Sequence, residues 1–245
     1  MIFILLFSSL LHWPPASTVG DINIDSTAVG YEWWDQWLKK NVSATGEVNY
    51  KNMKSELGAL QSFTASLGKS APAATATKNE QLAYWINLYN AATIQLVLEH
   101  YPLKSIRDIA NGKPWDEAFI SVGEKKYSLN NIENDVLRKK YADPRIHFAI
   151  NCASKSCPKL LNGAYLPDKM EVQLNSMTKL FINDASKNKI TATQIDISEI
   201  FNWYQKDFMQ QGSVIHFLNE WSATRISTNA SIHYLNYDWS LNEAL

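Results

Sequence analysis

The sequence predicts a single α+β domain that is rich in helices and contains a small, mainly antiparallel sheet. Three observations lead to this fold class. The length of 245 residues suits one large domain. Hydrophobic residues make up 46% of the chain and charged residues 19%, which is a globular composition. More segments show the helical spacing of apolar residues than show the alternation of apolar and polar residues typical of strands. No repeat or linker divides the chain.

The N-terminus has the pattern of an export signal. Residues 1–13 form an uncharged, apolar run that Pro14, Pro15 and small residues follow. This pattern predicts a signal peptide over residues 1–18, a mature domain over 19–245, and a periplasmic or secreted location. The run is shorter than the roughly 20 residues of a membrane-crossing helix, so we expect no stable membrane span. An uncleaved anchor is the alternative.

The first half of the chain predicts three helices. Three tryptophans form an apolar stripe within a helix over 31–42, and a second helix follows over 51–67. The small, uncharged residues 70–77 predict a surface connection. Residues 80–101 are apolar on nearly all sides, which predicts a buried central helix that stops before Pro102.

The second half mixes strands and helices. Residues 118–129 alternate on both sides of a Gly-Glu turn and predict a hairpin. Asn130 and Glu133 have capping-box spacing, which predicts a helix through Lys140. Residues 145–151 alternate as a short strand would. Three further helices are predicted over 165–185, 197–208 and 214–222. A partly extended segment over 232–242 follows them.

The charge and composition of the chain exclude several classes of partner and site. The chain has 23 basic and 24 acidic residues, a net charge of −1 and no basic block, which argues against nucleic acid. Two cysteines exclude a disulfide-rich scaffold and a four-cysteine zinc site. No glycine-rich phosphate loop or nucleophile-elbow serine occurs. We expect no cofactor and no metal; a peptide, a glycan or a small molecule remains as ligand, and the oligomeric state stays open.

The residues best suited to chemistry lie between 145 and 158. If residues 145–152 form a strand, Cys152 shares the core face, whereas His147 and Asn151 point together to the other face. Cys157 then lies in the loop beyond the strand.

One interpretation is a thiol enzyme. Cys157 would be the nucleophile, His147 its base, and Glu133 or Asn151 the group that orients the imidazole. Lys155 would lower the pKa of the Cys157 thiol. The predicted reaction is hydrolysis or acyl transfer at an amide or ester.

Other polar groups would bind the substrate in that interpretation. Asn87 and Asn90 are three residues apart and therefore adjacent on the buried helix, and Arg145 and Lys155 add positive charge. Backbone amides of residues 153–156 would stabilise the oxyanion.

The other interpretation is a binding module without catalysis. After export, Cys152 and Cys157 would close a six-residue disulfide loop worth roughly 2 kcal/mol. The braced loop and the aromatic residues would hold a ligand or partner. His147 would then be a core histidine, Glu133 part of a helix cap, and the two asparagines ties to a loop. A zinc site is disfavoured because His-x4-Cys-x4-Cys is not a usual spacing and no fourth ligand is evident.

Four segments of the chain resemble the domain of unknown function 547 family. They are LAYWINLYNAATI, YSLNNIENDVLR, DPRIHFAINCASKSCP and YDWSLN, and together they span residue 42 to the C-terminus. The family occurs in exported bacterial proteins and in plant proteins, without an established activity. It is in turn similar to papain-like or transglutaminase-like thiol enzymes, which carry a cysteine at the start of a buried helix and a histidine on a later strand. Residues 82–94 resemble that helix but contain no cysteine. The resemblance therefore implies either a nucleophile moved to Cys157 or a related fold without thiol chemistry.

Overall fold

The computed structural model describes residues 30–244, so the predicted signal peptide lies outside the described residues. The described chain is a helix-rich α+β domain, which confirms the predicted fold class. Its longer elements are α1 (Glu32–Asn41), α2 (Tyr50–Lys54), α3 (Leu57–Lys69), α4 (Lys78–His100), β1 (Ile120–Val122), β2 (Lys125–Tyr127), η4 (Asn131–Tyr141), α5 (Met170–Ile182), β3 (Lys189–Ile190), β4 (Gln194–Ser198), α6 (Ile200–Trp203), α7 (Gln205–Phe208), α8 (Val214–Trp221) and β5 (Ser231–Leu235). Short 3-10 turns lie between them: η1 (Ile106–Asp108), η2 (Ala110–Gly112), η3 (Pro114–Asp116), η5 (Pro144–Phe148) and η6 (Pro167–Lys169).

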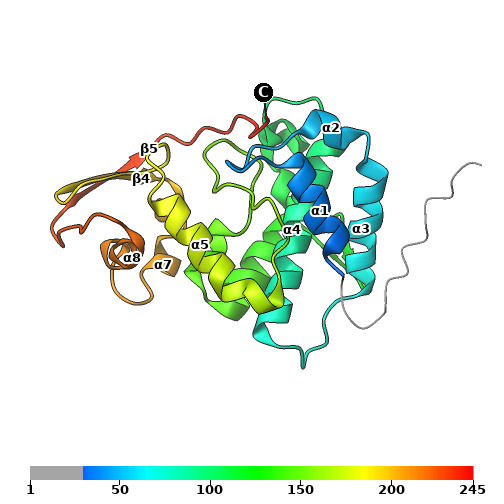
Figure 1. Ribbon diagram of the computed structural model, residues 1–245, viewed down its shortest axis with the longest axis horizontal. Coiled ribbons are helices and arrows are strands. Elements are labelled where there is room, and N and C mark those ends of the chain that lie inside the picture. Colours follow the sequence, from blue (N-terminus) through cyan, green and yellow to red (C-terminus); the bar gives the residue numbers. More distant parts are fainter. Residues whose placement is uncertain (1–29, 245) are drawn as a thin grey trace, which may run out of the picture.

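Helix α4 is the centre of the fold, as its apolar sequence predicts. Thr77 and Glu80 form a capping box at its start, and its buried residues lie on all sides of the helix. Helices α1 to α3 cover one side of α4, at the right of Figure 1. The β3–β4–β5 sheet, α7 and α8 lie at the opposite end of the molecule, and α5 runs between the two ends (Figure 1).

Two small sheets complete the domain. Strands β1 and β2 form the predicted antiparallel hairpin, which packs on α3. At that contact a Cβ on Gly68 would lie 2.1 Å from the carbonyl oxygen of Ser121, so only glycine permits the close approach. In the second sheet β3 is antiparallel to β4, and β4 is parallel to β5.

The last residues return from β5 to the far end of the molecule. This C-terminal segment, 236–244, crosses the top of Figure 1 in red. Tyr50 donates a hydrogen bond to Asn242 at 2.7 Å, and Ser154 pairs with Leu241 in a β-bridge. The segment therefore joins the two ends of the fold and passes directly beside the 151–158 loop.

Three local predictions are wrong. Residues 145–151 are not a strand: Pro144 begins the 3-10 turn η5, and the Asp143 side chain caps it by accepting from the Arg145 amide at 3.0 Å. The helix predicted over 51–67 is broken into α2 and α3. The helix predicted over 197–208 begins later, because the alternating residues 194–198 form β4 in the sheet.

The capping box predicted for Asn130 and Glu133 is also absent. Ser128 and Asn131 cap η4 instead, since each backbone amide donates to the other's side-chain oxygen, at 3.0 and 3.1 Å. The Asn130 side chain donates to Asp116. Glu133 is therefore free to face the interior of the protein.

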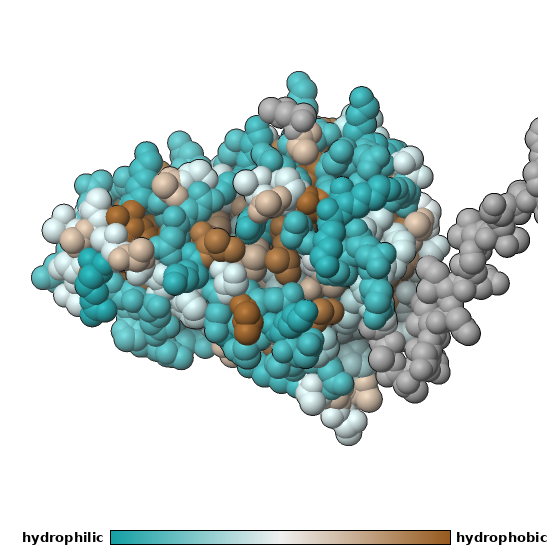
Figure 2. All heavy atoms as spheres, viewed as in Figure 1, coloured by the Kyte–Doolittle hydropathy of each residue, from teal (hydrophilic) through white to brown (hydrophobic). Residues whose placement is uncertain are grey.

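The surface is mostly polar. Figure 2 shows hydrophilic residues over most of one face, with hydrophobic residues in small separate patches. The large exposed apolar side chains are Val172, Leu180, Trp203 and Met209. Of the helices formed by residues 30–244, none is both long and apolar enough to cross a membrane.

Candidate functional site

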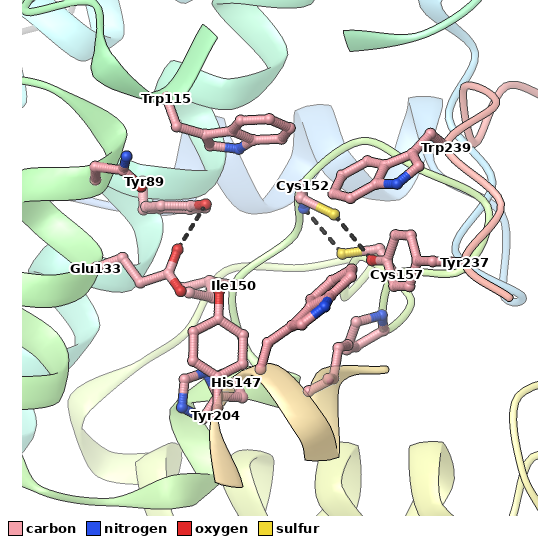
Figure 3. Close-up of a pocket in the computed structure, with 14 residues that line it drawn as sticks. Tyr89, Trp115, Glu133, His147, Ile150, Cys152, Cys157, Tyr204, Tyr237 and Trp239 are labelled. Carbon is pink, nitrogen blue, oxygen red and sulfur yellow. Dashed lines mark hydrogen bonds between the residues drawn. The ribbon is translucent and has the colours of Figure 1, made fainter. Parts of the chain in front are cut away.

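A cavity of about 260 Å³ lies where seven segments of the chain meet. Helix α4, the turns η3 and η5, helix η4, the 151–158 loop, the α6–α7 region and the C-terminal segment all contribute to its walls. Figure 3 shows Trp115 above the cavity, Tyr89 and Glu133 on one side, the cysteines and Tyr237 on the other, and His147 with Tyr204 below. The lining residues are Tyr89, Trp115, Asn130, Glu133, His147, Ile150, Cys152, Cys157, Pro158, Ile200, Trp203, Tyr204, Tyr237 and Trp239.

Two buried asparagines hold the 151–158 loop in place. Asn90 of α4 donates to the Ala149 carbonyl at 2.9 Å and accepts from the Asn151 amide at 2.9 Å. The Asn151 side chain in turn donates to the Pro158 carbonyl and accepts from the Ala153 amide, both at 2.8 Å. Both side chains therefore shape the backbone, and neither orients His147.

Cys152 lies in the cavity wall with hydrogen-bonding groups around its sulfur. The side chain is half-buried, and its Sγ lies 3.1 Å from the Ser154 hydroxyl and 3.2 Å from the Tyr237 hydroxyl. Burial raises the pKa of the Cys152 thiol. The hydrogen bonds from Cys157, Ser154 and Tyr237 outweigh that effect and lower the pKa below its usual value. Of the two cysteines, Cys152 is the one whose thiol pKa is lowered.

Cys157 has the opposite environment. Its side chain is only 5% exposed, and its Sγ accepts a hydrogen bond from the Cys152 backbone amide at 2.9 Å. Burial and the neighbouring Cys152 sulfur raise the pKa of the Cys157 thiol. The expectation of a buried Cys152 and an activated Cys157 is therefore reversed, because residues 145–152 do not form the strand on which it depended.

The structure also corrects three other expectations for this loop. Both cysteines are free thiols, so the disulfide is not formed. The exposed Lys155 side chain is not among the groups that shift the pKa of Cys157. Three of the four backbone amides proposed as an oxyanion site are occupied: the amide of Ala153 donates to Asn151, that of Lys155 to Ser240 and that of Ser156 to Asp238. The Ser154 amide is directed at the Cys152 sulfur and helps to lower the pKa of that thiol.

His147 faces an acid that sequence reasoning did not nominate. Its Nε2 lies 2.8 Å from Oδ2 of Asp207, whose carboxylate also accepts from Arg138 at 2.6 Å. Because an ionised carboxylate only accepts, Nε2 carries the hydrogen. The imidazole stacks on Tyr204 with ring centroids 4.0 Å apart. No hydrogen bond joins His147 to a cysteine within the described part of the chain, so the predicted Cys157–His147 pair is not assembled.

Glu133 forms another part of the cavity wall. Its side chain is buried, and Oε2 accepts a hydrogen bond from the Tyr89 hydroxyl at 3.3 Å. Burial and then the Glu133 charge raise the pKa of both Tyr89 and Tyr204. The carboxylate binds tyrosine hydroxyls and does not orient His147.

Two predicted substrate-binding residues lie elsewhere. Asn87 donates to the Tyr165 carbonyl at 2.7 Å and accepts from the Trp34 indole at 3.1 Å, so its amide is used by the fold. Arg145 pairs with Asp143 at 2.6 Å and Glu171 at 2.8 Å, away from the cavity. Neither lines the cavity.

The aromatic wall beside Cys152 was missed from the sequence. Trp203 stacks on Trp239 at 5.7 Å, Tyr237 packs on Trp239 at 4.6 Å, and Trp115 meets Trp239 edge-on at 5.5 Å. Tyr237 and Trp239 belong to the YDWSLN segment, which contributes to the family resemblance. That segment was the available signal, although nothing in it shows that it crosses to residues 151–158.

We expect Asp207→Asn to lower the free energy of unfolding by about 1–2 kcal/mol at pH 7, because it weakens charge-assisted hydrogen bonds from Arg138 and His147. Burial raises the pKa of Asp207, but these bonds outweigh it and hold the pKa well below the usual value. A depressed pKa stabilises the fold above the unfolded pKa of about 3.9, and this contribution is lost as the pH falls through the folded pKa. Urea unfolding at pH 7 and below pH 4 tests this; a gap between wild type and variant that does not narrow in acid would contradict it.

Comparison with known proteins finds one family that part of the chain resembles. Residues 73–182 match the model of the family described as "Protein of unknown function, DUF547". The match contains α4, Glu133, His147 and both cysteines, whereas Tyr237 and Trp239 lie beyond it. No cluster of three His, Cys, Asp or Glu side chains that could hold a metal ion occurs among residues 30–244. No curated protein and no solved structure is significantly similar to the chain. Residues 73–182, a little under half of the chain, are thus similar to the DUF547 family.

Proposed function

We propose that this protein is a thiol-dependent hydrolase or acyl transferase that acts on an amide or ester, with Cys152 as the nucleophile. The observation that carries the proposal is the position of Cys152. Its sulfur lies in the wall of a cavity, within 3.2 Å of two hydroxyl groups, and its thiol has a lowered pKa. Reactive cysteines have such partly exposed, thiolate-stabilising surroundings, whereas structural buried cysteines do not.

The chemistry needs no separate base to form the nucleophile. A thiol with a lowered pKa is partly ionised near neutral pH, its proton having passed to water. The Cys152 thiolate attacks the carbonyl carbon, and the C–S bond forms as the carbonyl electron pair moves to oxygen. When this pair returns, the bond to the leaving oxygen or nitrogen breaks, and the leaving group takes a proton from water. Attack by water on the thioester then releases the acid and restores the thiol.

The hydroxyls of Ser154 and Tyr237 lie close to the negative charge of the reaction. Ser154 and Tyr237 lie 3.2 Å from each other and bind the Cys152 sulfur in the resting state. As the negative charge moves from sulfur to the carbonyl oxygen, the Tyr237 hydroxyl can donate to that oxygen. It takes the role first given to the loop amides, three of which are occupied by other acceptors. His147 acts as a positioning residue, since it packs under Tyr204 and is held by Asp207.

We expect the reduced protein to release a burst of about one equivalent of p-nitrophenol from p-nitrophenyl acetate, with the acetyl group on Cys152. The rate of iodoacetamide alkylation at Cys152 should rise with pH around a midpoint below the usual thiol value of about 8.5, because the pKa of this thiol is lowered. Peptide mass mapping identifies the labelled cysteine, and the denatured protein is the control for intrinsic thiol reactivity. Acetylation of Cys157 instead, or a midpoint at or above the usual thiol value, would refute the proposal.

A further inference from the structure

We propose that the cavity binds an organic cation of the quaternary ammonium or alkylammonium class. We infer further that the substrate of Cys152 carries this cationic group, an inference that rests on the proposed acyl transfer. The feature that points to a cation is a buried carboxylate that faces a cavity lined by aromatic rings.

The first observation is the charge of Glu133. Its side chain is buried, yet Glu133 forms no ion pair with any residue in the range 30–244. Its hydrogen-bond partner at 3.3 Å is a neutral tyrosine hydroxyl. A buried charge is costly unless an opposite charge compensates it. Arg138 is nearby, but its guanidinium is committed to the Asp207 carboxylate at 2.6 Å.

The second observation is the composition of the walls. Tyr89, Tyr204, Tyr237, Trp115, Trp203 and Trp239 all line the cavity. The faces of aromatic rings attract cations, and a cage of several rings with an acid is the usual way in which proteins bind a quaternary ammonium group. A volume of about 260 Å³ suits a small head group better than a large ligand.

The third observation is that, within residues 30–244, no unpaired, buried positive side chain lines the cavity. No lysine or arginine is found among the described lining residues. Arg138 and Arg107 lie over two of the lining rings, Tyr204 at 4.9 Å and Trp239 at 5.3 Å, but Arg138 is paired with Asp207 and Arg107 is exposed. The Glu133 and Cys152 charges both contribute to the raised pKa of Tyr89 and Tyr204, after burial, which is the larger cause. The field in the cavity therefore favours positive ligands.

The geometry connects the cation to the thiol. In Figure 3 Glu133 and Tyr89 lie across the cavity from Cys152 and Tyr237. A substrate with its cationic group beside Glu133 would extend its carbonyl group toward the Cys152 sulfur. Binding of the cationic group would then hold the carbonyl carbon of the substrate in position beside the Cys152 sulfur.

The test compares choline with its neutral carbon isostere, 3,3-dimethylbutan-1-ol. Because three tryptophans and three tyrosines line the cavity, binding should change the intrinsic fluorescence of the reduced protein. We expect choline to bind about tenfold or more tightly than the isostere, in line with roughly 1–2 kcal/mol for a desolvated cation–π interaction. Equal affinities, or tighter binding of the isostere or of glucose, would overturn the cation assignment in favour of a neutral or sugar ligand.

Two variants sharpen the test. Glu133→Gln keeps an acceptor for Tyr89 but removes the charge, so the preference for choline over the isostere should fall by about tenfold. Glu124→Gln, on the exposed turn between β1 and β2, is the matched control and should leave the preference unchanged. Thermal melts establish that both variants fold. An unaltered preference in folded Glu133→Gln would refute the role of the carboxylate.

The same protein separates the two proposals. p-Nitrophenyl acetate is neutral and reports only the Cys152 thiol, whereas choline reports only the cage. A burst without choline binding would overturn the cationic substrate and leave the thiol enzyme standing. Choline binding without a burst would refute acyl transfer and leave a cation-binding module.

Discussion

Replacing Cys152 with serine is expected to reduce acyl-enzyme formation from p-nitrophenyl acetate by about a thousandfold or more, which is the scale of loss when a nucleophile is removed. A serine hydroxyl at this position is not appreciably ionised at neutral pH, and no neighbouring base contacts it within the described residues. Cys157→Ser is the matched substitution, one sulfur away in the same loop. Its hydroxyl can still accept from the Cys152 amide and donate to the Cys152 sulfur, so most of the burst should remain.

Cys157→Ala provides a separate signature. Alanine removes one of the hydrogen bonds that lower the pKa of Cys152, so this pKa should rise. The burst rate at pH 7 should therefore fall by severalfold and recover at pH 9, where the thiol ionises without that help. Stopped-flow release of p-nitrophenol across this pH range measures both effects. A Cys157→Ser variant without activity, beside an active Cys152→Ser variant, would restore Cys157 as the nucleophile.

Local patterns were sufficient to predict most of the helices. The apolar run of α4 and the tryptophan stripe of α1 carry their own periodicity, and the Gly123 turn specifies the β1–β2 hairpin. The 145–151 segment failed because alternation over a few residues is also compatible with a 3-10 turn. The Asp143–Pro144 pair was the stronger local signal, since it caps and begins a helical turn.

The site was only partly predictable for a different reason. Glu133, His147 and Cys152 were recognisable as chemical groups, and all three line the cavity. Their roles depend on partners distant in sequence: Tyr237 lies 85 positions from Cys152, and Asp207 lies 60 positions from His147. Nothing in the 145–158 segment indicates which cysteine meets the hydroxyls and which is covered by the core.

Asn90→Ala is expected to destabilise the protein by about 2–6 kcal/mol, because one buried side chain satisfies two backbone groups of the reactive loop. The variant would leave the Ala149 carbonyl and the Asn151 amide without their partner, at about 1–3 kcal/mol for each buried group. Asn229→Ala, at an exposed turn, is the control and should change stability by less than about 0.5 kcal/mol. Urea unfolding monitored by tryptophan fluorescence compares the two.

The same substitution should also affect Cys152 before the fold is lost. Asn90 sets the start of the 151–158 loop, and the Cys152 sulfur reaches Ser154 and Tyr237 only if that loop keeps its path. At temperatures where Asn90→Ala remains folded, the alkylation midpoint of Cys152 should therefore move up toward the usual thiol value. A strongly destabilised variant with an unchanged midpoint would show that Asn90 serves the fold alone. A stability loss below about 1 kcal/mol would show that water or neighbouring groups satisfy the freed backbone.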